Sequence, residues 1–584
     1  MPEHSDLSVL IVDPNPSMRG NLHNMLNQAA ITKVEYAVNS GTAIRLLTKK
    51  PFDIILCEYD LGSGTDGQDG QQLLEDLRHH KLIGLWTIFI MLTSEAIHSK
   101  VISAAELTPS DYILKPFTVD VLSGRIERAI ERRALFLPTY QLIDKGDLRE
   151  AVKSCRAAEL QHPRLAAYFA RLRAELHLTL GEWKEAEQIY ADTLATRPMA
   201  WAHLGLARTL FEQQRHEDAQ DALLELVEVN PRFMAAYDLL AKNHEAMGQQ
   251  MQAKKILEDA VAISPHMVRR LRHLGGIAFD TGDIGAAERA YKQVVTKAKY
   301  SEFRDPEDHV NLVKTLVKKG DAPQASGVLR DMERSLRGGA NVEACRAISA
   351  AMLHELSGND IAAASELQLA AAALDGARGL STQLKVGLVQ SCLKNNLEQA
   401  ASDVMMKLVN EADSEVTMEA AVDVFEKAGR HDLAQGMGQQ IKNQVQELMQ
   451  DAASKSESGE LKGAVFVLRQ ALRKTPGNLP VLFASVDAIL RQLNMLGWEA
   501  PLAEQAQHQM QVIRKIDPKH PKLESLKQQY AATQHKYGIA TLVLPGQDLG
   551  KRGTREALFL GLKDWIMPRN DIGQSSHVSR ISGA

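Results

Sequence analysis

Along residues 1–133, short apolar runs alternate with longer stretches whose apolar positions repeat at helical spacing. The runs predict five β-strands over residues 9–12, 34–36, 54–57, 87–92 and 112–114. Strands that alternate with helices build a parallel sheet covered by helices on both faces. We therefore expect an α/β doubly wound domain over residues 1–133. Such domains carry their function at the carboxyl ends of the strands.

Polar side chains follow four of these runs. Asp13 comes after the first run, Glu58 after the third, Thr93 after the fourth and Lys115 after the fifth. Because the carboxyl ends of parallel strands meet at one edge of a sheet, we expect the four side chains to converge. Two carboxylates suit a divalent cation, and a hydroxyl with a lysine suits phosphoryl oxygens. The pattern indicates a site for a phosphoryl group.

The segments around these positions are VLIVDPNPSMR, FDIILCEYDLG, DGQQLLEDLR, FIMLTSEA and SDYILKPF, in that order. Together, over residues 7 to about 133, they resemble the response-regulator receiver family, which has the flavodoxin-like form of the doubly wound fold. The resemblance implies a cis peptide bond before Pro116. It also implies a switch in which Thr93 and Lys115 engage phosphate while the ring of Tyr112 moves inward.

Two positions depart from the family pattern. Paired acids usually follow the first strand, whereas this chain has Asp13-Pro14. We therefore expect a Mg²⁺ site at Asp13 to be weak or absent, and we expect no other cofactor. The phospho-acceptor position holds Glu58 in place of aspartate. Its longer side chain reaches toward the space of a phosphoryl group, but it carries one negative charge where a phosphoryl group carries about 1.5 to 2.

Three interpretations of Glu58 stay open. In the first, the glutamate imitates the phosphorylated state and biases the receiver permanently. In the second, the site has decayed, and the domain only packs or dimerises. In the third, the receiver is phosphorylated after all, and Asp60 is the nearby candidate acceptor although it lies two residues further along the loop.

Beyond residue 134 the period changes, and alanine, glycine and proline recur at intervals of about 34 residues. The clearest unit is MAAYDLLAKNHEAMGQQMQAKKILEDAVAISP. Its Tyr237, Ala241, Gly248, Ala253 and Pro265 fall at the positions of the tetratricopeptide pattern, which the array resembles. This predicts an all-α superhelical solenoid of helix pairs.

The repeats are not equally regular. Residues 134–300 contain well-formed repeats, 301–444 degenerate helical repeats and 445–536 repeat-like C-terminal helices. The segment DAASKSESGELKG, which begins at Asp451, is expected to interrupt the array. Residues 537–584 form a tail that we expect to be partly disordered, with one possible helix at REALFLGLKDWI.

Repeats of this family bind peptides or protein surfaces in a groove lined by the first helix of each pair. Helical phase predicts a groove that is basic and carries aromatic side chains, which suits an acidic and partly hydrophobic partner. The predicted groove residues are Tyr168, Arg171, Trp201, Arg208, Phe211, Lys242, Arg269 and Arg272. The pattern of lysines and asparagines with which some repeats clamp a terminal carboxylate is not apparent.

Composition excludes several functions. The net charge of −5 is small for 584 residues and no basic run stands out, so we expect no nucleic-acid partner. An N-terminal targeting pattern is absent, and no uncharged run approaches the roughly 20 residues that span a bilayer, so we expect a cytoplasmic protein without membrane insertion. The four cysteines are far apart in sequence and are expected to be buried thiols. A nucleophile with a base, or a phosphate loop, is not found, so we expect no enzyme.

The two parts together predict a signalling adaptor of the two-component type. A receiver joined to repeats resembles regulators of the VieB type, which modulate a histidine-kinase relay. The groove partner is then a protein, with a histidine kinase or another response regulator as candidates. Two alternatives stay open: a response regulator that phosphorylation controls, and a structural scaffold that oligomerises, for which a homodimer is the simplest form.

Overall fold

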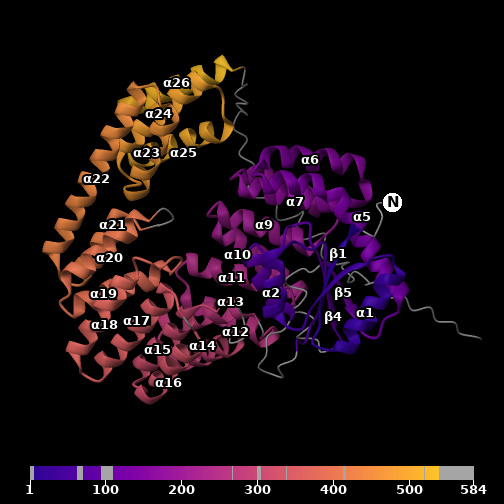
Figure 1. Cartoon of the computed structure of the whole chain (residues 1–584). Helices are drawn as coiled ribbons and strands as arrows, with labels where there is room; N and C mark the ends of the chain where they lie inside the picture. The colour runs from indigo at the N-terminus through magenta and orange to yellow at the C-terminus, as the bar shows by residue number, and fades with distance from the viewer. Residues whose placement is uncertain are drawn as a thin grey trace, which may run out of the picture. The chain divides into compact units, whose positions relative to one another are not determined.

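The structure is a computed structural model of the chain (Figure 1). It describes residues 6–61, 70–93, 110–265, 267–298, 304–336, 338–411, 416–517 and 520–537. These residues form two compact units that divide between Arg304 and Asp305. The first unit contains a sheet and the helices up to α14, and the second contains α15 to α26. Apart from Tyr537, the predicted tail lies outside the described residues.

Five parallel strands form the sheet: β1 (Ser8–Val12), β2 (Lys33–Ala37), β3 (Ile54–Glu58), β4 (Ile88–Thr93) and β5 (Asp111–Leu114). Their spatial order is β2-β1-β3-β4-β5. The order reverses beside β1, and ligands of doubly wound sheets bind outside the carboxyl ends at such a switch point. The predicted flavodoxin-like sheet is confirmed.

Helices cover both faces of the sheet. Because neighbouring strand residues point to opposite faces, Val9 and Ile11 belong to the core under α1 (Pro16–Gln28) and α5 (Val119–Asp144). Leu10 and Val12 belong to the core under α2 (Ser40–Lys49) and α3 (Gly70–His79). Strands buried on both faces explain why the sequence shows continuous apolar runs instead of strict alternation.

Helix α5 is shared by the receiver and the repeats. Thr118 caps its N-terminus, and the helix continues for 26 residues to Asp144. Leu122 and Ile126 pack under the sheet, whereas Phe136 belongs to the first core of the repeat array. The boundary expected at residue 133 therefore falls inside one helix, and the two domains are joined without a linker.

The repeats of the first unit are antiparallel helix pairs. Their small residues, such as Ala174, Ala207 and Ala241, are completely buried where helices cross. The helices are α6 (Leu148–Gln161), the short 3₁₀ helix η3 (Pro163–Leu165), α7 (Ala166–Thr179), α8 (Trp183–Thr196), α9 (Ala200–Glu212), α10 (His216–Val229), α11 (Met234–Ala246), α12 (Gln250–Ile263), α13 (Val268–Asp280) and α14 (Ile284–Ala298).

Two positions show why glycine recurs in the repeat pattern. Gly248 turns the chain between α11 and α12 with a φ of 73°, a conformation that other residues rarely adopt. Gly205 lies inside α9, where a Cβ atom would lie 2.2 Å from the ring of buried Tyr190. Close approach of α8, the second helix of one pair, to α9, the first helix of the next pair, therefore depends on the missing side chain at Gly205.

The second unit continues the pattern of helix pairs through the sequence that looked degenerate. Turn glycines such as Gly320 and Gly358 again have positive φ. The helices are α15 (Pro306–Lys319), α16 (Ala322–Ser335), α17 (Ala340–Leu356), α18 (Asp360–Ala373), α19 (Thr382–Lys394), α20 (Glu398–Asn410), α21 (Met418–Lys427), α22 (His431–Glu457), α23 (Leu461–Lys474), α24 (Leu479–Leu496), α25 (Ala500–Ile516) and α26 (Pro521–Lys536).

The expected interruption at Asp451 is wrong. Helix α22 continues through this segment to Glu457, and only a short turn with Gly459 separates it from α23. The alanine, lysine and glutamate of the segment are good helix formers, and their propensity outweighs the serines. Among the described residues, α24 is long and apolar enough to cross a membrane, but 56% of its length is buried inside the protein, as in a core helix.

Candidate functional site

Four predicted site residues lie where the parallel strands end. Glu58 and Thr93 are the last residues of β3 and β4, whereas Asp13 and Lys115 directly follow β1 and β5. Asp13, Glu58 and Thr93 are 2%, 8% and 1% exposed, so this edge is buried although its residues are polar. The backbone N–H of Lys115 donates to the carbonyl of Thr93 at 2.7 Å, which brings β5 and β4 together at the site.

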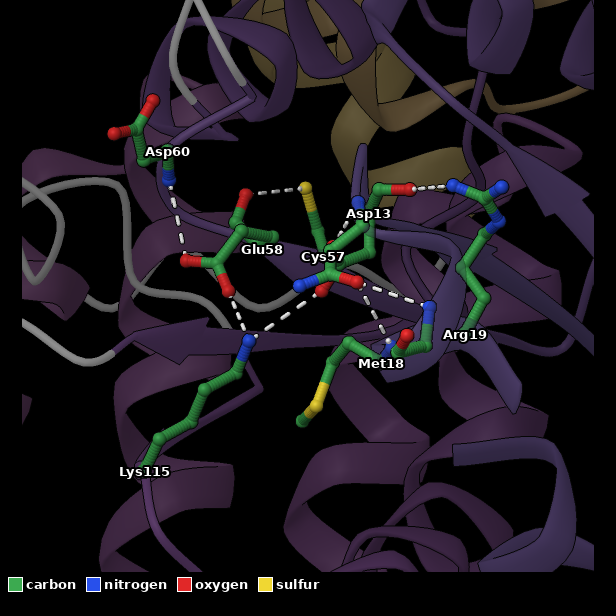
Figure 2. A network of polar contacts seen from close by, with 9 residues as sticks. Asp13, Met18, Arg19, Cys57, Glu58, Asp60 and Lys115 are labelled. Atoms are coloured by element: carbon green, nitrogen blue, oxygen red, sulfur yellow. Dashed lines mark hydrogen bonds and ion pairs between the residues drawn. The ribbon is translucent and has the colours of Figure 1, made fainter. Parts of the chain in front are cut away.

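The Lys115 ammonium lies between two carboxylates (Figure 2). It donates to Oε2 of Glu58 in an ion pair and to Oδ2 of Asp13 at 3.4 Å. Charge-assisted hydrogen bonds in a poorly hydrated place are stronger than at an open surface. Lys115, which was predicted to bind a phosphoryl group, is therefore already engaged by Glu58, which stands at the predicted acceptor position.

Both oxygens of the Glu58 carboxylate accept hydrogen bonds. While Oε2 faces Lys115, Oε1 accepts from the backbone N–H of Asp60 at 3.2 Å. In Figure 2 the Asp60 carboxylate itself points away from Lys115. The candidate acceptor of the third interpretation thus contributes its backbone to the site, while its side chain lies elsewhere.

The loop after β1 is held by Arg19 and by the cap of α1. Nη1 of Arg19 donates to the Asp13 carbonyl at 2.6 Å, and the Asn15 N–H donates to Oδ1 of Asp13 at 2.8 Å. The Asn15 side chain in turn accepts from the N–H groups of Ser17 and Met18, which begins the helix. These contacts fix Asp13, and they come from residues that the sequence analysis did not single out.

The Mg²⁺ that a receiver implies does not fit this arrangement. A divalent cation prefers several oxygen ligands, but the paired acid is replaced by Pro14, and Asp13 and Glu58 share the Lys115 ammonium. Among the described residues, no group of three metal-ligating side chains lies together. The ammonium provides the positive charge between the two carboxylates.

The predicted switch tyrosine is half-buried in β5. Tyr112 is opposite Met91 of β4 in the sheet and packs against the core under α2 and α3. The Lys115–Pro116 peptide bond is cis, as the resemblance implied. The switch role of Tyr112 stays a prediction.

All eight predicted groove residues lie on first helices. Tyr168 and Arg171 are on α7, Lys242 is on α11, and α9 and α13 carry the remaining five. Helices α7 and α9 touch, as do α9 and α11, so these first helices lie next to one another. The exposed residues of the set are Tyr168, Arg171, Arg208, Lys242 and Arg269, and the half-buried ones are Trp201, Phe211 and Arg272.

Aromatic and basic side chains of the set contact one another. The Arg171 guanidinium lies 5.7 Å from the centre of the Trp201 ring, within the range of a cation–π contact. The Trp201 ring also contacts the buried ring of Tyr190. The two ring centres lie 6.3 Å apart, and the rings meet edge to face. Burial raises the pKa of the Tyr190 hydroxyl, so the phenol stays neutral.

Carboxylates on the same helices were missed by the sequence analysis. Asp238 accepts two hydrogen bonds from the buried Arg270, at 2.7 and 2.9 Å, and Glu245 is paired with His273 at 2.5 Å. Glu175 is paired with Arg171 at 3.1 Å. Their i,i+3 or i,i+4 spacing from Lys242 and Arg171 was the available signal.

Three basic residues on α9, α11 and α13 are not paired with any of these carboxylates. Within the part of the chain that the structure describes, Arg208, Lys242 and Arg269 make no ion pair or side-chain hydrogen bond. Their charges therefore face solvent without an internal ion-pair partner, while Asp238 of α11 is paired with Arg270 of α13 and Glu245 of α11 is hydrogen-bonded with His273 of α13. The described first helices present a net positive surface at these three positions.

The parallel sheet, the polar residues at the carboxyl ends of its strands and the helix pairs define a receiver followed by helical repeats. Comparison with known proteins agrees. Residues 9–127 match the family model of the response regulator receiver domain, and residues 141–199 match a tetratricopeptide repeat model. The chain is 30% identical over 126 residues to the chemotaxis protein CheY of Pseudomonas aeruginosa, covering 22% of this chain and 98% of that protein. It is 28% identical over 129 residues to CheY-3 of Vibrio cholerae, covering 22% and 95%.

Among solved structures, the chain is similar to a tetratricopeptide repeat protein from Parabacteroides merdae. The identity is 18%, with 44% of this chain and 97% of that chain covered, at a TM-score of 0.30. Through its N-terminal domain the chain belongs to the response regulator receiver family, and tetratricopeptide repeats follow that domain. It is a signalling protein of two-component type with protein-interaction repeats, built from domains that are generally non-enzymatic and typically soluble.

Proposed function

We propose that this protein is a non-enzymatic cytoplasmic adaptor whose receiver does not cycle through phosphate and whose repeats bind a protein partner. The observation that carries the proposal is the ion pair between Lys115 and Glu58. Phosphorylation of a receiver creates a negative group beside this lysine. Here the Glu58 carboxylate already lies beside this lysine, so Glu58 acts as a permanent substitute for the phosphorylated acceptor.

Three further features support a receiver that takes no phosphate. Pro14 supplies no carboxylate, and the two carboxylates that remain, Asp13 and Glu58, both contact the Lys115 ammonium. The Asp60 carboxylate points away from Lys115. A transferred phosphoryl group needs positioned positive charge at its oxygens, and the positive charge of this edge is engaged by Asp13 and Glu58.

The state of the receiver is coupled to the repeats through α5. This helix contributes to both cores, and its second half is tied to the sheet because Nη2 of Arg132 donates to the Ser110 carbonyl at 2.9 Å. A secondary-structure element that two sites share can carry coupling between them. We infer that the fixed receiver holds the first repeats in one arrangement that suits the partner.

The partner is proposed to present an acidic segment to the predicted groove. Arg208 and Lys242 lie 242 − 208 = 34 residues apart, at equivalent places of consecutive repeats on α9 and α11. Packed helix axes lie about 8–10 Å apart, and an extended chain rises about 3.3 Å per residue. Two acidic residues separated by roughly three positions in an extended segment can therefore meet both cations, while Trp201 and Tyr168 offer apolar contact.

The receiver half of the proposal is tested by labelling. The full chain is incubated with radioactive acetyl phosphate and Mg²⁺ beside a receiver that has the usual paired acids and aspartate acceptor. We expect label on the reference protein and none above background on this chain. Label that disappears in an Asp60→Ala variant would contradict the proposal and favour control by phosphorylation.

The repeat half is tested by capture from native cells with the full chain as bait. In the groove variant, Arg208→Glu is combined with Lys242→Glu, which should reduce the captured partner at least about tenfold because two contacts become repulsive. The matched control combines Lys184→Glu with Lys255→Glu, two exposed lysines on α8 and α12. An equal loss in both variants, or in neither, would contradict binding in the predicted groove. A histidine kinase or another response regulator is the partner we expect.

A further inference from the structure

Helix α23 presents an exposed face that is both basic and aromatic. Its 14 residues include four lysines and arginines and no aspartate or glutamate. Three of these cations lie with one phenylalanine on the solvent side, at the spacing i, i+4, i+7 and i+11 of a single helix face. We call this set the basic face: Lys462, Phe466, Arg469 and Arg473. The Phe466 ring is 60% exposed, so its apolar surface is open to a partner.

The cations of the basic face are not neutralised within the chain. In the part of the chain that the structure describes, none of Lys462, Arg469 and Arg473 forms an ion pair. Nη2 of Arg469 donates to the side-chain oxygen of Gln505 at 2.9 Å, and this partner is uncharged. The fourth cation of the helix, Lys474, is buried and donates to two amide oxygens. Helix α23 therefore keeps its positive charge.

Helix α10 carries the complementary pattern. Three carboxylates and one leucine lie on its exposed side at the same spacing of i, i+4, i+7 and i+11. We call this set the acidic face: Glu217, Asp221, Leu224 and Glu228. Among the described residues, none of the three carboxylates forms an ion pair or a side-chain hydrogen bond. Leu224 is 44% exposed, so this face also combines unpaired charge with an open apolar group.

The two faces match residue by residue when the helices run antiparallel. Because both faces have the same spacing and each residue adds about 1.5 Å along a helix, one register brings all four positions level. Each cation then faces a carboxylate, and phenylalanine faces leucine. The four pairs are Lys462 with Glu228, Phe466 with Leu224, Arg469 with Asp221, and Arg473 with Glu217. A parallel arrangement would instead place Phe466 against a carboxylate and Leu224 against an arginine, so the pattern specifies the direction.

Each face is left uncovered by its own unit. Helix α10 packs on α9 and α11, and α23 packs on α22 and α24. The basic face and the acidic face are the sides of these helices that stay exposed after this packing. A second copy of the chain offers each face a partner of opposite charge, and such complementarity favours the correct partner and speeds its association.

We propose that the basic face of one copy binds the acidic face of a second copy, with α23 and α10 antiparallel, so that the chain assembles with itself. The contact between phenylalanine and leucine lies between ion pairs, which exclude water from it. Because the contact joins two different surfaces, it either closes into a ring of copies or continues from copy to copy. This assembly is independent of what the predicted groove binds.

Exchanging the charges of the two faces tests the proposal in the full chain. The first variant makes the basic face acidic through Lys462→Glu, Arg469→Glu and Arg473→Glu. The second variant makes the acidic face basic through Glu217→Lys, Asp221→Lys and Glu228→Lys. Each variant then carries two faces of the same charge. We expect its self-association to be at least about tenfold weaker than that of the wild type, measured by sedimentation velocity over a series of protein concentrations.

An equimolar mixture of the two variants is the decisive sample. Each face of one variant meets a face of opposite charge on the other, so assembly should return although neither variant assembles alone. A folding defect cannot produce this recovery. The matched control reverses three exposed cations of the second unit through Arg330→Glu, Arg334→Glu and Lys442→Glu, and it should assemble like the wild type.

Several outcomes would overturn the proposal. A wild-type chain that stays monomeric at every concentration would exclude a second copy as the occupant. Variants that assemble like the wild type would exclude the two faces. Loss of assembly in both variants without recovery in the mixture would mean that the faces do not bind each other. Because the contact consists largely of ion pairs at the surface, wild-type assembly should also weaken as salt is raised, and assembly that salt strengthens would contradict it.

Discussion

The Arg133 guanidinium and the Asp53 carboxylate form an ion pair at 2.9 Å, and this pair fastens α5 to the amino-terminal edge of the sheet. The other oxygen of Asp53 accepts from the N–H and hydroxyl of Ser8 at 3.0 and 2.9 Å. Three residues after Arg133, Phe136 stacks on Phe169 of α7, with ring centres 4.0 Å apart. One turn of α5 therefore connects the receiver to the repeats.

Removing the carboxylate should loosen this joint. We expect Asp53→Ala to lower the free energy of opening of β1 and β3 by about 1–2 kcal/mol, because a partly buried cation loses its partner and Ser8 loses its acceptor. Hydrogen exchange of the strand amides measures this. Asp6→Ala, which removes an exposed ion pair with Lys33, is the control and should change little. Equal effects of the two substitutions would mean that Asp53 does not fasten the joint.

The same carboxylate should give the receiver a sensitivity to acid. Burial tends to raise the pKa of Asp53, but hydrogen bonds from Ser8 and Arg133 outweigh it and lower the pKa. A carboxyl whose pKa is lower in the folded state stabilises the fold above the unfolded value of about 3.9, and this contribution is lost as pH falls through the folded pKa. The stability difference between wild type and Asp53→Ala should therefore be constant from pH 5 to 7 and shrink below about pH 4. A difference that grows on acidification would contradict this sign.

Restoring the family residues should restore phosphate chemistry. Glu58→Asp shortens the side chain away from Lys115, and Pro14→Asp supplies the missing acid for Mg²⁺. We expect the double variant to accept label from acetyl phosphate in the presence of Mg²⁺, and to lose it when Mg²⁺ is chelated. Each single variant should label less than the double variant. A double variant that stays unlabelled would mean that features beyond these two positions have inactivated the receiver.

The thiols should be inert in the folded protein. All four cysteines are buried and unpaired with one another, and burial raises the pKa of Cys155 to about 12 and that of Cys392 to about 11. The thiolate is the reactive form, so at pH 8 we expect no rapid reaction with a chromogenic disulfide reagent. In denaturant four thiols per chain should react. A fast-reacting thiol in the native protein would identify a cysteine that local opening exposes.

Much of this structure could be predicted because its patterns are local. The strand runs, the repeat period and the convergence of Asp13, Glu58 and Lys115 follow from spacing and from where parallel strands end. The pairs Arg133–Asp53 and Arg270–Asp238 could not be predicted, because each depends on how long side chains pack across helices or strands distant in sequence.

The interruption expected at Asp451 was wrong for a different reason. A serine-rich segment is typical of a break between helices. Here the alanine, lysine and glutamate residues beside the serines favour a helix, and packing keeps the segment helical. The groove carboxylates were visible in sequence by helical spacing, yet their contacts with Arg270 and His273 are seen only in the structure. Local periodicity therefore specifies the elements, and the ion pairs between elements emerge only from their packing.

Gly205 provides the sharpest test of how the repeats pack. Replacing glycine by alanine in a helix usually stabilises it by about 1 kcal/mol. At Gly205 the new methyl group would lie 2.2 Å from the ring of Tyr190, which is only 2% exposed. Overpacking of this kind costs about 1–3 kcal/mol, so Gly205→Ala should lower the melting temperature of the first unit.

Gly436→Ala is the control, because no atom lies within 4 Å of the position where its methyl group would be placed in α22. This substitution should be neutral or stabilising. Combining Gly205→Ala with Tyr190→Leu should cost less than the sum of the two single changes, because the smaller side chain makes room, and a double-mutant cycle measures that coupling. Additive effects would mean that the two residues do not meet as the structure places them.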